Sequence, residues 1–169
     1  MAAKKRRRPI ERRTFIASVT LIGAPGLSDF AQASDASIVE RFAATLSAHD
    51  MGAFADLFDD DYVNHQVSAA APPPPPGVAP KAATVAFFAA RLKAMPDLKV
   101  TIQTSLAAGD KAAASFAYEG TNTGPYYGFD PTGKRLFFTS CDIFRVKGDK
   151  IVEHWGMGDI AGVVAQLKG

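Results

Sequence analysis

Two carboxylates and a histidine near the end of the chain have the residue types and spacing for proton transfer. Asp142 stands in an apolar run beside Ile143 and Phe144. A carboxylate in such surroundings is costly unless it is paired or hydrogen-bonded, and functional residues often break local rules in this way. His154 lies in the next apolar segment, and Asp159 follows it. A shielded carboxylate could abstract an activated C–H proton while a nearby donor stabilises the enolate oxygen.

The pattern around these residues predicts a β-hairpin. Leu136 to Val146 and Ile151 to Met157 both read as strands, with a Gly-Asp turn between them. Alternation puts Asp142 on one face of the first strand together with the even-numbered aromatic residues. Pairing of equidistant residues then places Asp142 opposite Trp155 or Gly156, one step from the histidine. We therefore expect an acid and an imidazole to share one cluster.

The elements that must position this cluster follow a simple order, with helices first and strands after. The predicted helices span Asp35–Ala48, Gly52–Phe58, Lys81–Ala94 and Ile160–Leu167, the extended segments span Tyr62–His65, Leu98–Leu106 and Lys111–Gly120, and Pro72–Pro76 form a surface loop. This order predicts the α+β class, with a cone-like curved sheet, mixed or mostly antiparallel, packed on three N-terminal helices and followed by a short C-terminal helix. Such a sheet leaves room for a cavity between its layers.

Residues 1–33 have the three-part form of an export signal. They carry seven Lys/Arg against two acidic residues, whereas residues 34–169 carry 12 Lys/Arg against 15 Asp/Glu. An apolar run from Phe15 to Leu27 follows the basic start, and Ala31-Gln32-Ala33 provides a small-residue cleavage site before Ser34. The run is too short for a membrane span, which needs about 20 apolar residues. We therefore expect no membrane anchor after cleavage.

The segment Arg12-Arg13-Thr14-Phe15-Ile16 resembles the twin-arginine export signal, which is read by a receptor. The sequence therefore predicts a periplasmic or secreted protein whose mature domain spans residues 34–169. Two other interpretations of the basic segment stay open, an ordinary secretory signal and a nucleic-acid-binding tail. The basic residues of the domain are scattered without interleaved aromatics, which argues against a nucleic-acid partner. Cys141 is the single cysteine, so no intramolecular disulfide can form.

Several segments of the domain resemble the SnoaL-like polyketide (ester) cyclase family. They are Phe54–His65, Gly120–Pro125, Pro131–Arg135, Asp142–Val146 and, as the most specific, Gly148–Asp159. The resemblance runs from about Ser37 to the C-terminus. It implies the curved α+β barrel, or cone, shared with nuclear transport factor 2, ketosteroid isomerase and scytalone dehydratase. It also implies a homodimer formed through the sheet.

The same resemblance implies a set of site residues and a reaction. In the characterised cyclases one carboxylate acts as general acid/base for an aldol ring closure, without a metal or an organic cofactor. By position that carboxylate corresponds to Asp159, and Asp142, His65 and His154 correspond to polar residues of the family's pocket. We therefore predict Asp159, Asp142 and His154 as catalytic residues and no metal site. The predicted substrate pocket consists of His65, Asn64, Tyr62, Phe88, Phe138, Phe144 and Trp155.

The residues leave alternatives open at two of these positions and for the function. Asp159 precedes the last predicted helix, so it could serve as the N-cap, a role that is compatible with catalysis. His154 could be a hydrogen-bonded core histidine. The favoured function is a cofactor-independent enzyme, a cyclase, isomerase or dehydratase, that acts on a small apolar carbonyl compound. The alternatives are a periplasmic module that binds such a molecule without chemistry, and an accessory protein whose cavity is filled by side chains.

Overall fold

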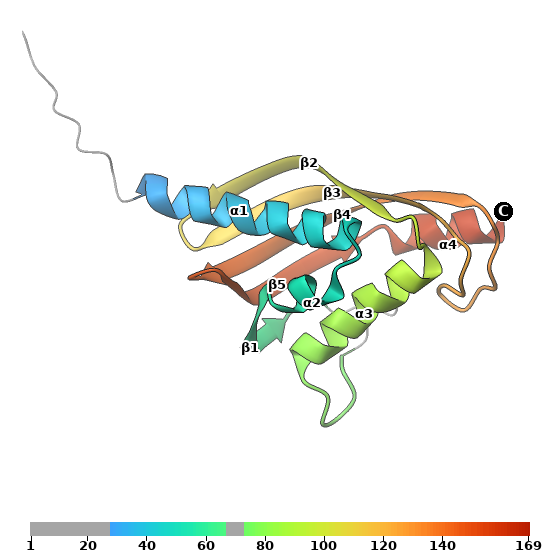
Figure 1. Cartoon of the computed structure of the whole chain (residues 1–169), viewed down its shortest axis with the longest axis horizontal. Helices are drawn as coiled ribbons and strands as arrows, with labels where there is room; N and C mark the ends of the chain where they lie inside the picture. Colours follow the sequence, from blue (N-terminus) through green and yellow to red (C-terminus); the bar gives the residue numbers. More distant parts are fainter. Residues whose placement is uncertain (1–27, 67–72) are drawn as a thin grey trace, which may run out of the picture.

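Five strands form one sheet in the order β1-β5-β4-β3-β2 (Figure 1). The computed structural model describes residues 28–66 and 73–169. Its strands are β1 (Phe58–Asn64), β2 (Lys99–Ala108), β3 (Lys111–Thr121), β4 (Arg135–Lys147) and β5 (Lys150–Gly158), and its helices are α1 (Ser28–Ser47), α2 (Met51–Ala55), α3 (Pro80–Ala94) and α4 (Ile160–Lys168). Strands β2 to β5 pair antiparallel, and β1 pairs parallel to β5. The predicted α+β class and mixed sheet are confirmed.

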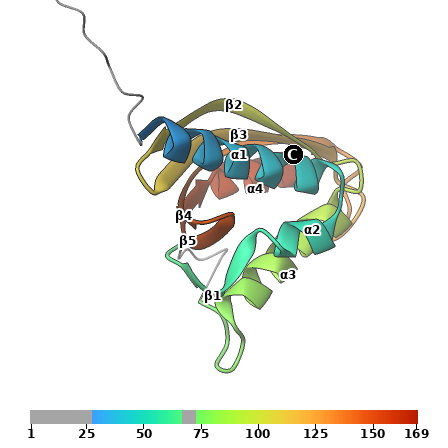
Figure 2. The same ribbon diagram turned by 60° about the vertical axis from the view of Figure 1, so that its left-hand side comes forward.

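The sheet curves around the N-terminal helices. Figure 2 shows α1 lying across β2 and β3, with α2 and α3 beside it and β1 next to α3. The C-terminal helix α4 packs on β4 instead. Three helices therefore cover the concave face, as the sequence predicts, and the short last helix lies apart from them.

Phe42 of α1 stands at the centre of the core between helices and sheet. Its ring lies 5.1–5.4 Å from four other rings, which belong to Phe54, Phe88, Phe116 and Phe144. These partners come from α2, α3, β3 and β4. Aromatic pairs at such distances add to the free energy gained by burying their surface. One side chain thus joins five elements around the concave face.

The element bounds differ from the predicted ones where tertiary contacts intervene. Helix α2 begins after Asp50, whose side chain accepts a hydrogen bond from the Ala53 N–H at 2.9 Å. The helix was expected to run to Phe58, but Phe58 opens β1 and lies in register with Ile151 of β5. The Ile151 N–H donates to the Leu57 carbonyl at 2.7 Å. Pairing with a strand distant in sequence therefore ends the helix early.

The N-terminal region can be compared with the prediction only in part. Residues 1–27 of the predicted signal peptide lie outside the described residues, and α1 begins at Ser28, ahead of the expected helix start at Asp35. Pro73–Pro76 form the expected loop before α3. Within the part of the chain that the structure describes, no helix combines the length and apolarity needed to cross a membrane.

Candidate active site

Asp142 and His154 form a buried hydrogen-bonded pair on the concave side of the β4–β5 hairpin. The Asp142 Oδ1 lies 2.7 Å from the His154 Nε2. Both side chains are almost fully buried, with exposed fractions of 5% and 1%. The register sets Asp142 opposite Gly156 and His154 opposite Phe144, so the two side chains are diagonal neighbours on one face. The predicted acid and imidazole cluster is therefore present.

The glycine opposite Asp142 is what makes this close approach feasible. A Cβ atom at position 156 would lie 2.5 Å from the Asp142 Oδ1 and 2.7 Å from the His154 Nε2. It would also lie 2.9 Å from the Gln66 Oε1, which approaches from the segment after β1. These distances are shorter than any relaxed contact of a carbon atom. Gly156 therefore provides the space in which three polar side chains meet.

The pair belongs to a longer network of buried hydrogen bonds. The Asp142 Oδ2 accepts a bond from the Ser140 hydroxyl at 2.5 Å, and the His154 Nδ1 lies 3.2 Å from the Tyr62 hydroxyl. Thr84 of α3 donates to the same Tyr62 oxygen at 3.4 Å. A neutral imidazole with its proton on Nε2 satisfies these partners, because Nε2–H then donates to Asp142 and Nδ1 accepts from Tyr62. Burial raises the pKa of Tyr62, so its hydroxyl keeps its proton at neutral pH.

A cavity lies beside Asp142, between α3 and the sheet. Its volume is about 20 Å³, which is room for a small polar group. The lining residues are Gln66, Phe87, Phe88, Arg91, Tyr118, Ser140, Asp142, Gly158 and Ile160. Asp142 is the one acidic residue among these lining residues, while His154 stands behind it. The arrangement can therefore present a carboxylate to a ligand and stabilise it from behind with an imidazole.

Five of the predicted pocket residues lie on this inner side. Tyr62 bonds to His154, and Asn64 donates to the Thr84 hydroxyl at 3.3 Å. Phe88 lines the cavity. The other two are packed aromatics, since Phe138 stacks on Tyr118 with ring centres 5.0 Å apart and Phe144 stacks on His154 at 5.1 Å. The alternation along β4 thus places its even-numbered aromatics beside the pair.

His65 and Trp155 lie on the opposite, outer face of the sheet. Their rings stack with centres 4.5 Å apart, and the His65 Nε2 lies 2.7 Å from the Glu153 Oε2. Trp155 follows His154 directly, so strand alternation turns it to the other face. His65 follows Asn64 in the same way, because Asn64 is in parallel register with His154. These two predicted pocket residues therefore do not line the cavity beside Asp142.

Asp159 is exposed and forms the N-cap of α4. Its Oδ1 accepts a hydrogen bond from the Gly162 N–H at 2.8 Å. Its chain neighbours Gly158 and Ile160 line the cavity, but the Asp159 side chain points to the helix end instead. The capping role left open by the sequence is therefore present. A catalytic role for Asp159 stays a prediction.

Three residues of the site were not singled out from the sequence. Ser140 holds the second carboxylate oxygen of Asp142, Gln66 approaches the pair near Gly156, and Arg91 lines the cavity from α3. A signal existed for Arg91, because it follows Phe88 by three residues and so falls on the apolar face of the helix. A local signal existed for Ser140 as well, because it precedes Asp142 by two residues and so shares its face of β4. Gln66 depends on a contact between distant segments, which no local pattern encodes.

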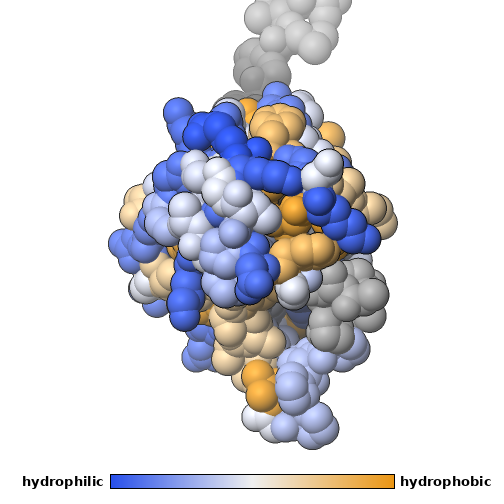
Figure 3. Space-filling model, turned by 90° about the vertical axis from the view of Figure 1, so that its right-hand side faces the viewer, coloured by the Kyte–Doolittle hydropathy of each residue, from blue (hydrophilic) through white to orange (hydrophobic). Residues whose placement is uncertain are grey.

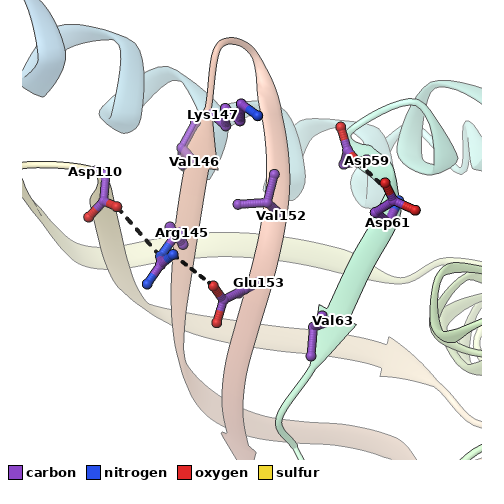
Figure 4. A pocket seen from close by; sticks show the side chains of 9 residues that line it. All are labelled: Asp59, Asp61, Val63, Asp110, Arg145, Val146, Lys147, Val152 and Glu153. Carbon is purple, nitrogen blue, oxygen red and sulfur yellow. Dashed lines mark hydrogen bonds and ion pairs between the residues drawn. The ribbon is translucent and has the colours of Figure 1, made fainter.

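A second, larger groove of about 500 Å³ lies on the outer surface near the β4–β5 turn (Figure 4). Arg145 bridges two of its carboxylates, with Nη1 3.0 Å from the Glu153 Oε1 and Nε 3.5 Å from the Asp110 Oδ2. Exposed ion pairs of this kind contribute little free energy and hold no shielded base. Within the described residues, no group of three His, Cys, Asp or Glu side chains is arranged to hold a metal ion. The buried pair is therefore the stronger candidate for chemistry.

Comparisons with known proteins agree on one family. The family model for SnoaL-like polyketide cyclases matches residues 36–167. IdmH from Streptomyces antibioticus, described as a candidate polyketide cyclase, is 25% identical with a TM-score of 0.69, covering 80% of this chain and 99% of its own. TsrD from Streptomyces laurentii is 24% identical with a TM-score of 0.68, covering 80% and 95%. No protein of curated function matches. This chain belongs to the SnoaL-like polyketide cyclase family.

Proposed function

We propose that this chain is a cofactor-independent enzyme that transfers a proton at a carbon next to a carbonyl group. Family membership indicates a cyclase- or isomerase-type enzyme. The observation that carries the proposal is the buried Asp142–His154 pair on the wall of a cavity. The proposed substrate is a small carbonyl compound with an apolar part, which the Phe87, Phe88 and Tyr118 rings of the cavity wall would contact, while the cavity itself has room for one small group.

In this proposal Asp142 is the acid/base and His154 is a positioning residue. Each carboxylate oxygen has two lone pairs, so Asp142 can accept a proton while it is bonded to His154 and Ser140. Removal of a proton from the substrate carbon leaves an enolate and a protonated Asp142. In a cyclase the enolate then attacks a second carbonyl, and the resulting alkoxide takes the proton from Asp142. In an isomerase the enolate takes that proton back from Asp142 at another carbon. The His154 imidazole, held by Tyr62, keeps the carboxylate oriented throughout.

Asp159 is the competing candidate for the base, and amide substitutions separate the two carboxylates. We expect full-length protein in D₂O to accelerate deuterium exchange at the activated carbon of aryl ketones and keto esters, followed by proton NMR. Asp142→Asn should slow this exchange about 100-fold, the usual range for loss of general-base catalysis. Asp159→Asn should leave it unchanged, because asparagine keeps the helix cap.

The opposite result would assign the base to Asp159. A chain that binds the carbonyl compounds but exchanges no proton in either form would instead be a binding module. His154→Gln should weaken the exchange and shift its pH profile, since the imidazole acts through Asp142. An unchanged pH profile in that variant would leave His154 a purely structural role.

A further inference from the structure

Arg91 is a buried cation on the wall of the cavity, 7% exposed. Its guanidinium carbon lies 4.8–5.2 Å from the centres of four rings, those of Phe87, Phe88, Tyr118 and Phe138. Its Nε donates to the Tyr126 hydroxyl at 3.0 Å. These contacts hold the guanidinium plane in one orientation. Arg91 is thus a fixed positive charge rather than a mobile surface side chain.

The charge of Arg91 has no carboxylate partner among the described residues. None of their ion pairs includes Arg91. Asp142 lines the same cavity, but its hydrogen bonds go to His154 and Ser140. Tyr118 and Tyr127 stay neutral, because burial raises the pKa of Tyr118 well above its usual range and raises the pKa of Tyr127 to about 12. A buried ion is normally paired. Asp142 supplies the one carboxylate of this cavity wall, and no hydrogen bond or ion pair joins it to Arg91, so within the described residues the Nη atoms of Arg91 have no direct anionic partner.

We propose that Arg91 is the anion-recognition residue of the cavity and that the ligand is a carbonyl compound carrying a carboxylate. The inference rests on the proposed function and adds the charge of the substrate to it. With Nε–H bonded to Tyr126, the remaining N–H donors of Arg91 are on the two Nη atoms, whose fork geometry matches a carboxylate. The cavity next to Arg91 has a volume of about 20 Å³, which is room for one small polar group and not for the whole compound.

Binding of a matched acid and ester by the full-length protein tests the proposal without requiring catalysis. The probes are 3-benzoylpropionate and its methyl ester, which differ chiefly in charge, measured by titration calorimetry. We expect the acid to bind at least tenfold more tightly than the ester. Arg91→Met should abolish this preference by weakening the binding of the acid more than that of the ester, while Arg91→Lys should retain part of it.

An exposed arginine provides the matched control. Arg135 lies on β4, and its exposed side chain pairs with Glu119 at 2.7 Å. Arg135→Met should keep the full preference for the acid, which shows that overall positive charge does not produce it. Equal affinities of acid and ester, no binding of the acid at millimolar concentration, or an unchanged preference in Arg91→Met would overturn the proposal. If Arg91→Met fails to fold, the wild-type ratio and Arg91→Lys still decide.

Failure of this inference can be told apart from failure of the proposed function. Asp142→Asn should lose deuterium exchange but keep or strengthen the preference for the acid, because it removes a negative charge from the wall of the same cavity. A wild-type protein that prefers the acid and exchanges no proton would remove the proposed reaction and leave Arg91 as an anion-binding residue. Exchange on neutral ketones without any preference for the acid would remove the role of Arg91 alone.

Discussion

At the residue scale, the site depends on how little space the backbone at Gly156 leaves beside the Asp142–His154 pair. Gly156 and Gly158 both lie on β5, two residues apart, and so face the same side of the sheet. A Cβ at 156 would meet the Asp142 carboxylate and the His154 ring, whereas a Cβ at 158 would have its nearest contact at 3.9 Å, the Ser140 Cβ. The two glycines therefore form a matched pair for substitution.

We expect Gly156→Ala to destabilise the fold and to break the Asp142–His154 hydrogen bond. The added methyl group cannot fit without moving both side chains, and overpacking of this kind costs about 1–3 kcal/mol. Urea denaturation should show this loss in the free energy of unfolding, and deuterium exchange should slow in parallel. Gly158→Ala should be neutral in the free energy of unfolding, because its methyl group would meet no atom closer than 3.9 Å. Similar behaviour of the two variants would contradict the space argument.

At the element scale, α4 holds the beginning of β4, where β5 no longer pairs with it. The Gln166 side chain accepts from the Phe137 N–H at 2.9 Å and donates to the Phe137 carbonyl at 2.7 Å, so it replaces a neighbouring strand. Val163 and Leu167 bury the apolar side of the helix. Asp159 caps the other end of this helix. The cap therefore supports β4, which is the strand that carries Asp142.

Substitutions of Asp159 separate capping from charge. Asp159→Ala should lower the free energy of unfolding by about 1 kcal/mol, since the Gly162 N–H loses its acceptor, and Asp159→Asn should change it little. Thermal or urea unfolding measures both values. If Asp159→Asn instead abolishes exchange at unchanged stability, Asp159 acts through its charge rather than as a cap.

At the scale of the whole molecule, part of the outer face of the sheet is apolar. A shallow apolar hollow of about 300 Å³ lies there, and Leu106, Cys141 and Ile143 are among its lining residues. Met157 is exposed on the same face, next to Cys141 in the register. Figure 3 shows another part of the surface, one end of the molecule, where hydrophilic residues lie between the hydrophobic ones. Larger exposed apolar patches often mark interaction sites, and the homodimer predicted from the family resemblance stays a prediction.

We expect a homodimer in solution that is formed through this face. Ile143→Asp should give a monomer in sedimentation or light-scattering measurements, because a charge would be buried at the interface. Val78→Asp is the matched control, since Val78 in the loop before α3 is 42% exposed and Ile143 is 43% exposed. A wild-type monomer at micromolar concentration would exclude this assembly.

Export is also a property of the whole chain, and it stays a prediction. We expect the protein expressed in a bacterium to appear in the periplasm with Ser34 as its first residue, as measured by mass spectrometry. Replacement of Arg12 and Arg13 by lysine should retain the precursor in the cytoplasm, because a receptor reads this pair. Arg6→Lys and Arg7→Lys together are the control within the same basic segment. Precursor that is never processed would contradict the prediction.

Local sequence patterns were enough to predict the order of the elements and the faces of the strands, although not every element boundary. Alternation along 136–146 puts Asp142 and Phe144 on one face, the turn after Val146 makes the hairpin, and Asp159 stands where a helix needs a cap. The structure agrees with all three and selects Gly156, of the two residues considered, as the partner of Asp142. Periodicity and turn chemistry act within a few residues, so they can be read without the fold.

Only the tertiary structure decided which groups surround Asp142. The parallel pairing of β1 with β5 brings Tyr62 to His154 and turns His65 outward. The packing of α3 brings Arg91 to the cavity. These contacts join segments far apart in the chain, where chain entropy opposes their meeting and a shared core offsets it. The base was therefore assigned to Asp159 from resemblance, while the buried partners that favour Asp142 appear only once the sheet has closed around α3.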